Sequence, residues 1–308
     1  MISEALNGAM RLIHDFYRQA DEIVNSFAQR LNENPLPSLI YHNTDDVGLQ
    51  GILKSGTLWF TDIFNLNDPT ELRHGLNPAV ELLKQRAENG APELEDFLTR
   101  FQEMVQSGVE EIAHFFVCCF SKDGNDLGQW RAYADNGRGY VIGFDGVLLE
   151  KVFTASATNN SNYWTFPITY KDNELRQMHT EIIDKFIPLY LLPRERNFNN
   201  DDLRRYLTEL STSFAEPILR SALLFKHDAY ENEQEYRFLQ VHPAGPLDGV
   251  KNRIRLYSLI RYREFDWRTV AARSLKKIII GPAADKSLAD QFAKDCLRKT
   301  IIALAPKM

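Results

Sequence analysis

Residues 39–61, LIYHNTDDVGLQGILKSGTLWFT, decide the fold, because they combine a strand, a short helix and a second strand in close succession. The apolar run at 39–42 predicts the first strand, and either residue of the Thr-Asp pair at 44–45 can cap the helix that follows. Gly56 is placed to end this helix. The aromatic and branched residues of 57–61 then suit a pleated surface and predict the second strand.

Helical patterns in the rest of the chain arrive in blocks and not after every strand. Two blocks are expected, at 70–112 with breaks at Pro78 and Pro92, and at 173–223 with divisions at Pro188 and Pro193. Apolar or alternating runs predict further strands at 115–120, 140–144, 235–241 and 277–281. This order favours an α+β fold with a mixed or antiparallel sheet over a doubly wound parallel sheet.

The N-terminal segment has a helical pattern of its own. Between Ile2 and Leu31 apolar residues recur every three or four positions, which predicts one amphipathic helix, and Asn34–Pro37 ends it. We therefore expect an N-terminal helix and linker at 1–38. A single α+β domain with the two helical insertions, closed by a helix near 285–297, would occupy 39–308.

Composition and charge narrow the class of protein. The chain has 308 residues, 44% of them hydrophobic and 25% charged, which is typical of a globular protein. No apolar run approaches the length of a membrane helix, and the N-terminus does not resemble a secretory signal, so we expect a cytoplasmic protein. The three cysteines, Cys118, Cys119 and Cys296, have neither disulfide nor metal-site spacing.

The formal charge of −6 is unevenly distributed. Residues 251–277 contain nine Lys or Arg and two acidic residues, which makes this segment basic against an acidic remainder. Such a band can bind the phosphates of a nucleotide, a nucleic acid or a partner, and it can also be a solvated face of strands and loops.

Four segments, read together, resemble the bacterial family called domain of unknown function 2971. The resemblance spans about 39–285, and the closing Ile278–Pro282 also suits it. Its segments are Tyr41-His42 with Gly51–Leu53 and Gly56–Trp59; Leu66–Pro69 with Glu71; Cys119–Ser121 with Trp130 and Tyr133; and Glu233–Arg237. The family name implies no mechanism.

A looser similarity concerns the split-sheet, NAD-binding fold of ADP-ribosyltransferases. It rests on a Tyr-His on a first strand, a helix and strand reaching Gly56 and Trp59, an aromatic-Ser segment, and a late Glu-x-Glu. The similarity implies cleavage of the bond between nicotinamide and ribose, through a cationic, oxocarbenium-like sugar. His42 lacks the following Gly-Thr pair of the poly-ADP-ribosylating branch.

The similarity also implies roles for particular residues. Glu235 would stabilise the cationic sugar, Glu233 would orient the acceptor, and Arg237 would keep Glu235 ionised. Strand alternation is expected to place these three side chains on one face. NAD, as the substrate, would be bound by Tyr41, His42, Trp59, Ser121, Tyr133 and Arg237, with His42 on the adenosine ribose and Trp59 or Tyr133 on the nicotinamide.

Several of these residues also have structural interpretations. His42 fits a satisfied histidine at a strand end, and Glu231, Glu233 and Glu235 fit a solvated strand face paired with Arg237. Trp130 and Tyr133, at helical spacing, fit core packing.

The segment after the second strand has a structural interpretation too. Asp68–Glu71 fits a helix capping box. Glu71 and His74 have the spacing of a metal-binding pair, but a second pair is absent from the sequence, so no metal site is expected.

We therefore expect an enzyme similar to ADP-ribosyltransferases, which binds NAD and transfers ADP-ribose to a protein or nucleic-acid acceptor as a toxin or phage-defence effector. The alternative is a non-catalytic, nucleotide-sensing or protein-binding regulatory module that uses the same cleft. Glu235→Gln is expected to lower turnover by at least about a hundredfold and to leave the fold intact.

Overall fold

The strand-helix-strand unit at the start of the domain forms as its sequence predicts. The unit comprises β1 (Leu39–Thr44), α2 (Asp46–Ser55) and β2 (Thr57–Asp62). The structure is a computed structural model, and it describes residues 4–33, 36–66, 69–89, 91–107, 113–158, 161–194, 198–255 and 257–304. The side chain of Asp45 caps α2 by accepting a hydrogen bond from the Gly48 amide. Gly56 ends the helix with a φ of 72°, a left-handed conformation that costs glycine little.

Within the described residues, nine strands form one sheet, and every strand pairing in it is antiparallel. The strand order is β7-β8-β2-β3-β1-β4-β9, while β6 pairs with β3 and β5 pairs with β6. The predicted α+β fold with an antiparallel sheet is therefore confirmed. The remaining strands are β3 (Ala113–Ser121), β4 (Tyr140–Asp145), β5 (Asn162–Pro167), β6 (Glu235–Pro243), β7 (Lys251–Arg255), β8 (Ser258–Asp266) and β9 (Leu275–Ile280).

The sheet splits along one edge of β3, because this edge is shared by two strands. β2 pairs with β3 at Thr61, opposite Val117. β1 pairs with the same edge four residues further on, where Tyr41 lies opposite Ser121. Between these two points β1 and β2 diverge, so the backbone of residues 118–120 faces a gap on this edge while its other edge pairs with β6.

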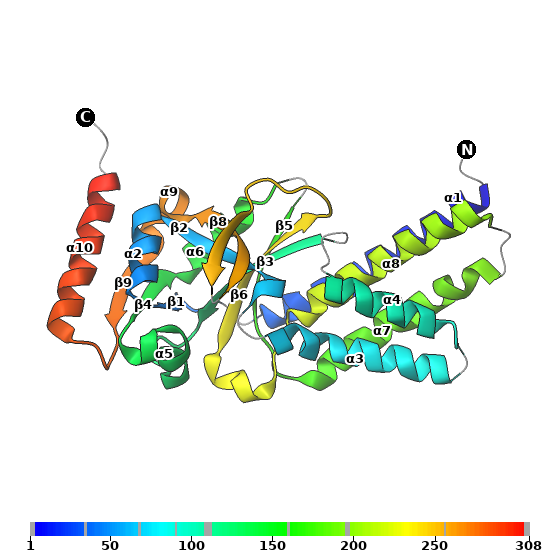
Figure 1. The fold of residues 1–308 in the computed structure, drawn as a ribbon, viewed down its shortest axis with the longest axis horizontal. Helices are drawn as coiled ribbons and strands as arrows, with labels where there is room; N and C mark the ends of the chain where they lie inside the picture. The colour runs from blue at the N-terminus through cyan, green and yellow to red at the C-terminus, as the bar shows by residue number, and fades with distance from the viewer. Residues whose placement is uncertain are drawn as a thin grey trace.

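Helices cover the two faces of the sheet unequally. One face carries Val117 and Leu239 and packs against a bundle at one end of the molecule, made of α1, α3, α4, α7 and α8 (Figure 1). The opposite face carries Phe120 and Phe238 and is covered by α2, α6, α9 and α10. The bundle helices are α1 (Glu4–Leu31), α3 (Pro69–Glu88), α4 (Leu94–Ser107), α7 (Asp172–Leu191) and α8 (Asn200–Ala222). The others are α5 (Leu127–Tyr133), α6 (Gly146–Ala155), α9 (Trp267–Ala271) and α10 (Lys286–Leu304).

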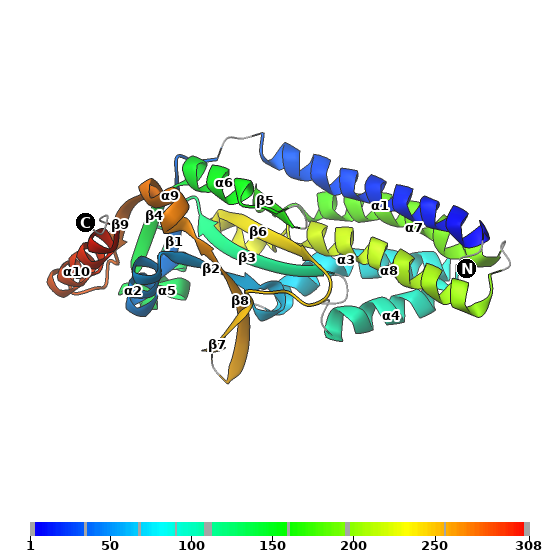
Figure 2. The ribbon, with the colours of Figure 1, turned by 90° about the horizontal axis from the view of Figure 1, so that it is seen from above.

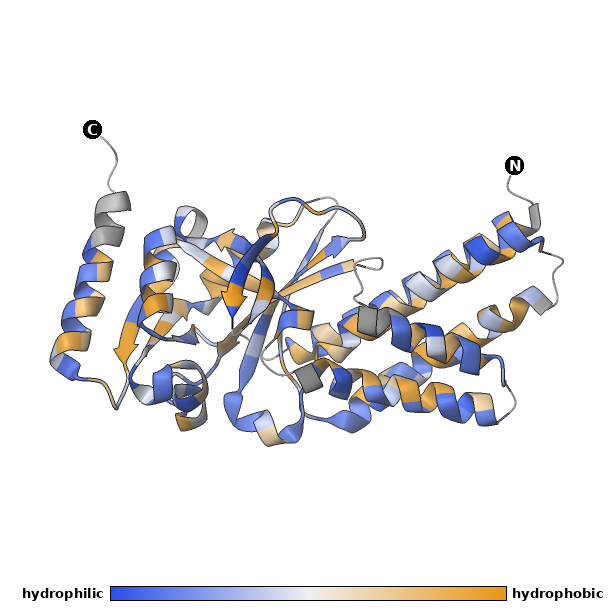
Figure 3. Cartoon of the chain, in the orientation of Figure 1, coloured by the Kyte–Doolittle hydropathy of each residue, from blue (hydrophilic) through white to orange (hydrophobic). Residues whose placement is uncertain are grey.

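The amphipathic N-terminal helix is present as α1, and it packs against α7 and α8. The helices of the bundle carry both hydrophilic and hydrophobic residues along their length, as Figure 3 shows. Asp21 on α1 pairs with Arg220 on α8 at 2.5 Å, and the Arg220 guanidinium lies 4.2 Å from the centre of the Trp164 ring on β5. One buried arginine thus ties α1 to both α8 and the sheet. None of the described helices is long and apolar enough to cross a membrane.

Two expected helix breaks are wrong. Pro78 lies inside α3 and Pro188 lies inside α7. A proline in a helix costs about 3 kcal/mol. Both helices bury an apolar side in the bundle around the proline, with Ala79 after Pro78 and Phe186 before Pro188, and this packing offsets the cost. The expected breaks at Pro92 and Pro193 are confirmed, since both fall between α-helices.

The basic band contains a β-hairpin that the sequence pattern did not reveal. Strands β7 and β8 occupy residues 251–255 and 258–266, and α6 and β5 were also not predicted. The hairpin projects beyond the rest of the sheet (Figure 2). β7 contains one apolar residue, Ile254, and both Ile254 and Leu259 are exposed, which explains why hydrophobic patterning gave only a weak signal.

Candidate functional site

A pocket of about 570 Å³ lies at the split of the sheet. Its volume is within the range of small-molecule sites in proteins. The residues that line it come from β1, α2, β2, α3, β3, α5, β6 and β7 and from the segment that precedes β6. All eight residues selected from the sequence line this one pocket: Tyr41, His42, Trp59, Ser121, Tyr133, Glu233, Glu235 and Arg237.

Five charged side chains form a cluster on one wall of the pocket, and we call this group the charge cluster. Glu235 accepts hydrogen bonds from Arg237 at 2.5 and 3.2 Å and from Lys226 at 3.1 Å. Arg237 also pairs with Glu71, and Lys226 with Glu233. Three carboxylates and two cations leave the charge cluster with one net negative charge when all are ionised.

The charge cluster determines the protonation state of Glu235, whose side chain is only 6% exposed. Burial by itself would raise the pKa of this carboxyl group, but the charges of Arg237 and Lys226 lower it from 4.5 to about 2. Burial likewise opposes the charge on Lys226, yet Glu235 and Glu71 raise the pKa of this ammonium group. Glu235 is therefore ionised at neutral pH, as expected from its pairing with Arg237, although Lys226 contributes as well.

Lys226 and Glu71 belong to the charge cluster but were not predicted from the sequence as site residues. Glu71 lies in the first turn of α3, where a capping role already accounted for it. Lys226 follows α8 and belongs to no motif. The only signal in the sequence was the Asn-Asp-Pro-x-Glu segment, of which Asn67 and Asp68 lie outside the described residues, so the proposed capping box is not described.

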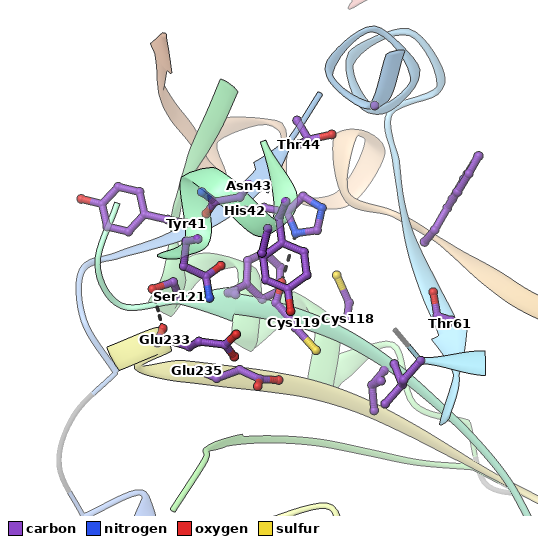
Figure 4. Close-up of a pocket in the computed structure, with 18 of the residues that line it drawn as sticks. Tyr41, His42, Asn43, Thr44, Thr61, Cys118, Cys119, Ser121, Glu233 and Glu235 are labelled. Carbon is purple, nitrogen blue, oxygen red and sulfur yellow. Dashed lines mark hydrogen bonds between the residues drawn. The ribbon is translucent and has the colours of Figure 1, made fainter. Parts of the chain in front are cut away.

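Glu233 does not lie on a strand, which corrects the expected alternation of Glu233, Glu235 and Arg237. It ends a 3-10 turn (Asp228–Glu233), and Gln234 follows with a φ of 44°, so β6 begins only at Glu235. The Ser121 hydroxyl donates to the Glu233 carbonyl oxygen at 2.8 Å and fixes this turn against β3. Figure 4 shows the side chains of Glu233 and Glu235 next to each other at the pocket wall.

The carboxyl group of Glu233 is more accessible than that of Glu235, with 15% of its side chain exposed. Burial raises its pKa, while Lys226 acts in the opposite direction. The interpretation of Glu231, Glu233 and Glu235 as one solvated strand face is therefore wrong, because Glu235 is buried and the other two belong to the turn.

His42 enters the pocket from β1 with a defined tautomer. Its Nδ1 lies 3.0 Å from the carbonyl oxygen of Cys119, which can only accept, so Nδ1 carries the proton. Burial lowers the pKa of the imidazole, which is therefore neutral, and Nε2 keeps a lone pair. In the part of the chain that the structure describes, Nε2 has no hydrogen-bond partner. His42 is thus a satisfied histidine at Nδ1 and an available acceptor at Nε2.

The aromatic residues take different positions around the pocket. Trp59, 41% exposed, packs against Tyr262 with ring centres 4.5 Å apart. Tyr133 is partly exposed and lines the pocket, whereas Trp130 on the same helix is buried in the core, so the core interpretation holds for Trp130 alone. Tyr41 points away from His42 because neighbouring residues of a strand face opposite sides, and the Lys277 ammonium covers its ring at 5.0 Å.

Two alternative roles, a nucleophilic cysteine and a metal pair, do not fit the surroundings of Cys119 and of Glu71 with His74. Burial, together with the negative charge of Glu235, raises the pKa of the Cys119 thiol well above its ordinary value, so Cys119 is not an activated nucleophile. His74 pairs with Asp172 at 3.1 Å, and no group of side chains among the described residues has the arrangement of a metal site. Glu71 faces Arg237 and so does not act with His74 as a metal pair.

One family model matches part of the chain. Residues 129–238 match the model of the family described as protein of unknown function (DUF2971). The matched stretch runs from α5 to β6 and contains Tyr133 and four of the five residues of the charge cluster. Neither a curated protein nor a solved structure matches the chain. The resemblance to the domain of unknown function 2971 family is thus shown for residues 129–238.

Proposed function

We propose that the protein binds NAD in this pocket and transfers ADP-ribose from it to an acceptor. The observation that carries the proposal is the meeting of His42 and the charge cluster in one cavity, at the split of an antiparallel sheet. His42 and Glu235 are almost two hundred residues apart in the chain, and the two groups supply a neutral acceptor and an excess of negative charge.

The charge cluster suits a reaction in which a sugar becomes cationic. When the bond between the nicotinamide nitrogen and C1′ of the ribose breaks, the bonding electron pair leaves with nicotinamide and the positive charge moves to the sugar. The net negative charge of the five groups attracts this sugar more strongly as its charge develops. The acceptor then bonds to C1′ and releases a proton, for which Glu233 is the more accessible carboxylate.

His42 and the aromatic side chains would hold the substrate. The lone pair on Nε2 can accept a hydrogen bond from a hydroxyl of the adenosine ribose. Of the two aromatic residues expected to stack on the nicotinamide, Tyr133 is the better placed, since it is partly exposed at the pocket, whereas Trp59 already packs against Tyr262 and Arg253. Ser121 acts indirectly, because its hydroxyl fixes the turn that carries Glu233.

The proposal includes a bacterial, cytoplasmic effector, either a toxin or a phage-defence protein, with a protein or nucleic-acid acceptor. A non-catalytic, nucleotide-sensing or protein-binding module remains the alternative. The pairing of Glu235 with both Lys226 and Arg237 favours this alternative, because a carboxylate so fully compensated also fits a purely structural role.

Calorimetry with NAD, followed by mass spectrometry of released nicotinamide in the presence of protein and nucleic-acid acceptors, separates the two functions. Transfer predicts both binding and release, and it predicts that Glu233→Gln lowers the rate of release by about a hundredfold while binding changes little. Glu231→Gln is the matched control, since Glu231 lies in the same turn outside the charge cluster. Binding without nicotinamide release would establish the sensor instead.

A further inference from the structure

The β7–β8 hairpin forms a second wall of the pocket, and this wall is basic. Arg253 and Arg255 both line the pocket. They are two residues apart on β7, so their side chains lie on the same face, about 7 Å apart along the strand. On this face, the opposite positions in β8 are Ile260 and Ser258, neither of which carries a charge.

Arg253 and Arg255 differ from the other cations of the pocket in having no carboxylate partner among the described residues. Lys226 and Arg237 are neutralised inside the charge cluster. Lys251, on the same strand, pairs with Glu264 at 2.8 Å. Burial and the charge of Arg255 lower the pKa of Arg253, so the two guanidinium groups repel each other in the free protein. An anion placed between them would remove this repulsion.

The aromatic residues next to Arg253 hold it in position. Its guanidinium carbon lies 5.2 Å from the centre of the Trp59 ring, and Trp59 packs against Tyr262. Stacking on an aromatic face leaves the edge of a guanidinium group available for hydrogen bonds in its plane. The Nε of Arg253 is buried and has no acceptor in the described part of the chain.

The N-terminus of α2, which also lines the pocket, is already occupied by side chains. Helix N-termini often bind anions through free amides. Here the Gly48 amide donates to Asp45 at 2.7 Å and the Val47 amide donates to Asp46 at 2.8 Å. These two amides are therefore occupied by the protein's own carboxylates, and a bound anion would meet the hairpin arginines instead.

We propose that Arg253 and Arg255 form a subsite for the diphosphate group of a nucleotide. The bidentate geometry of guanidinium groups suits phosphate oxygens. This inference rests on the proposed function only for the identity of the nucleotide. In this arrangement the diphosphate binds at the hairpin wall, and the ribose that loses its nicotinamide lies next to the charge cluster. The pocket then selects phosphorylated nucleotides over nucleosides.

Titration with inorganic pyrophosphate and ADP tests the subsite without any NAD chemistry. Arg255→Gln and Arg253→Gln should each weaken both ligands by about tenfold or more, and the double variant by about a hundredfold, because each removes a charge-assisted contact. Arg255→Lys should keep part of the affinity. Lys251→Gln, which removes a paired cation from the same strand, should bind like the wild type.

Two results would overturn the subsite: pyrophosphate and ADP that do not bind the wild type, or that bind equally to wild type and double variant. Circular dichroism and thermal unfolding check that the double variant is folded. The outcome is separable from the proposed function. If ADP binds through the arginines and NAD is not cleaved, the subsite stands and ADP-ribose transfer fails. If nicotinamide is released at an unchanged rate by the double variant, the transfer stands and the subsite fails.

Discussion

Replacing Glu235 by glutamine should destabilise the protein by about 3 kcal/mol at pH 7. The carboxylate has a pKa of about 2 in the folded protein against an ordinary value of 4.5, and this difference corresponds to about 3 kcal/mol of extra stabilisation of the ionised form. Breaking a buried ion pair from one side typically costs about 3–5 kcal/mol, which agrees in size. The variant would leave Arg237 and Lys226 buried with one counter-charge fewer.

Chemical denaturation of wild type and variant from pH 7 to pH 3 measures this effect. Because the folded-state pKa of Glu235 is the lower one, its contribution is complete above pH 4.5 and is lost as the pH falls towards 2. The difference in unfolding free energy between wild type and Glu235→Gln should therefore shrink in acid. The structure thus revises the expectation that this substitution leaves the fold intact, and nicotinamide release by the variant has to be measured where it is folded.

Glu81→Gln is the control for a loss of one carboxylate. Glu81 pairs with Arg176 at 3.0 Å, but its side chain is 61% exposed, so its loss should change stability by less than about 1 kcal/mol. If Glu235→Gln unfolded at the same denaturant concentration as the wild type at pH 7, the ion pairs of the charge cluster would contribute nothing and the reasoning on Glu235 would be refuted.

Two further predictions concern His42 on β1 and Cys119 on β3. Because burial lowers the pKa of His42, NAD affinity measured by calorimetry should decline in acid only with a midpoint below pH 6.5, and it should fall about tenfold in His42→Ala at pH 7.5. A decline centred at pH 6.5 or above would contradict this. Burial and the charge of Glu235 raise the pKa of Cys119, so its thiol should react with iodoacetamide at pH 8 far more slowly than an exposed thiol. Mass spectrometry measures the labelling rate, and labelling as fast as that of a free cysteine would show that the thiolate forms.

Local signals explain why the core of the fold could be predicted. The helix of the strand-helix-strand unit at 39–61 is capped by Asp45 at one end and by Gly56 at the other, so nearby residues indicate both of its boundaries. The pairing of β1 and β2 with one edge of β3, in contrast, has no local signature. A split sheet was implied by the resemblance to ADP-ribosyltransferases, but the strands that border the split were not predicted.

The charge cluster shows where prediction from sequence ends. Arg237 is two residues from Glu235, and strand alternation was enough to pair them. Lys226 contacts the same carboxylate because the turn between them, which ends at Glu233, brings the two residues together. Glu71 contacts Arg237 from a helix more than 160 residues earlier in the chain. Contacts of this kind depend on the tertiary fold, and the positive φ of Gln234 shows how one residue can also remove a neighbour from the expected strand.

The split of the sheet has a mechanical consequence, because the strands on its two sides are joined by α2. The separation of β1 and β2 is bridged by a helix of ten residues, a stiff spacer, and α10 at the far end of the chain lies against it. α2 therefore links the two sides of the pocket through a stiff element, and the C-terminal helix packs against that element. A displacement of α2 would therefore move residues on both sides of the pocket at once, because β1 and β2 are the strands directly before and after it in the chain.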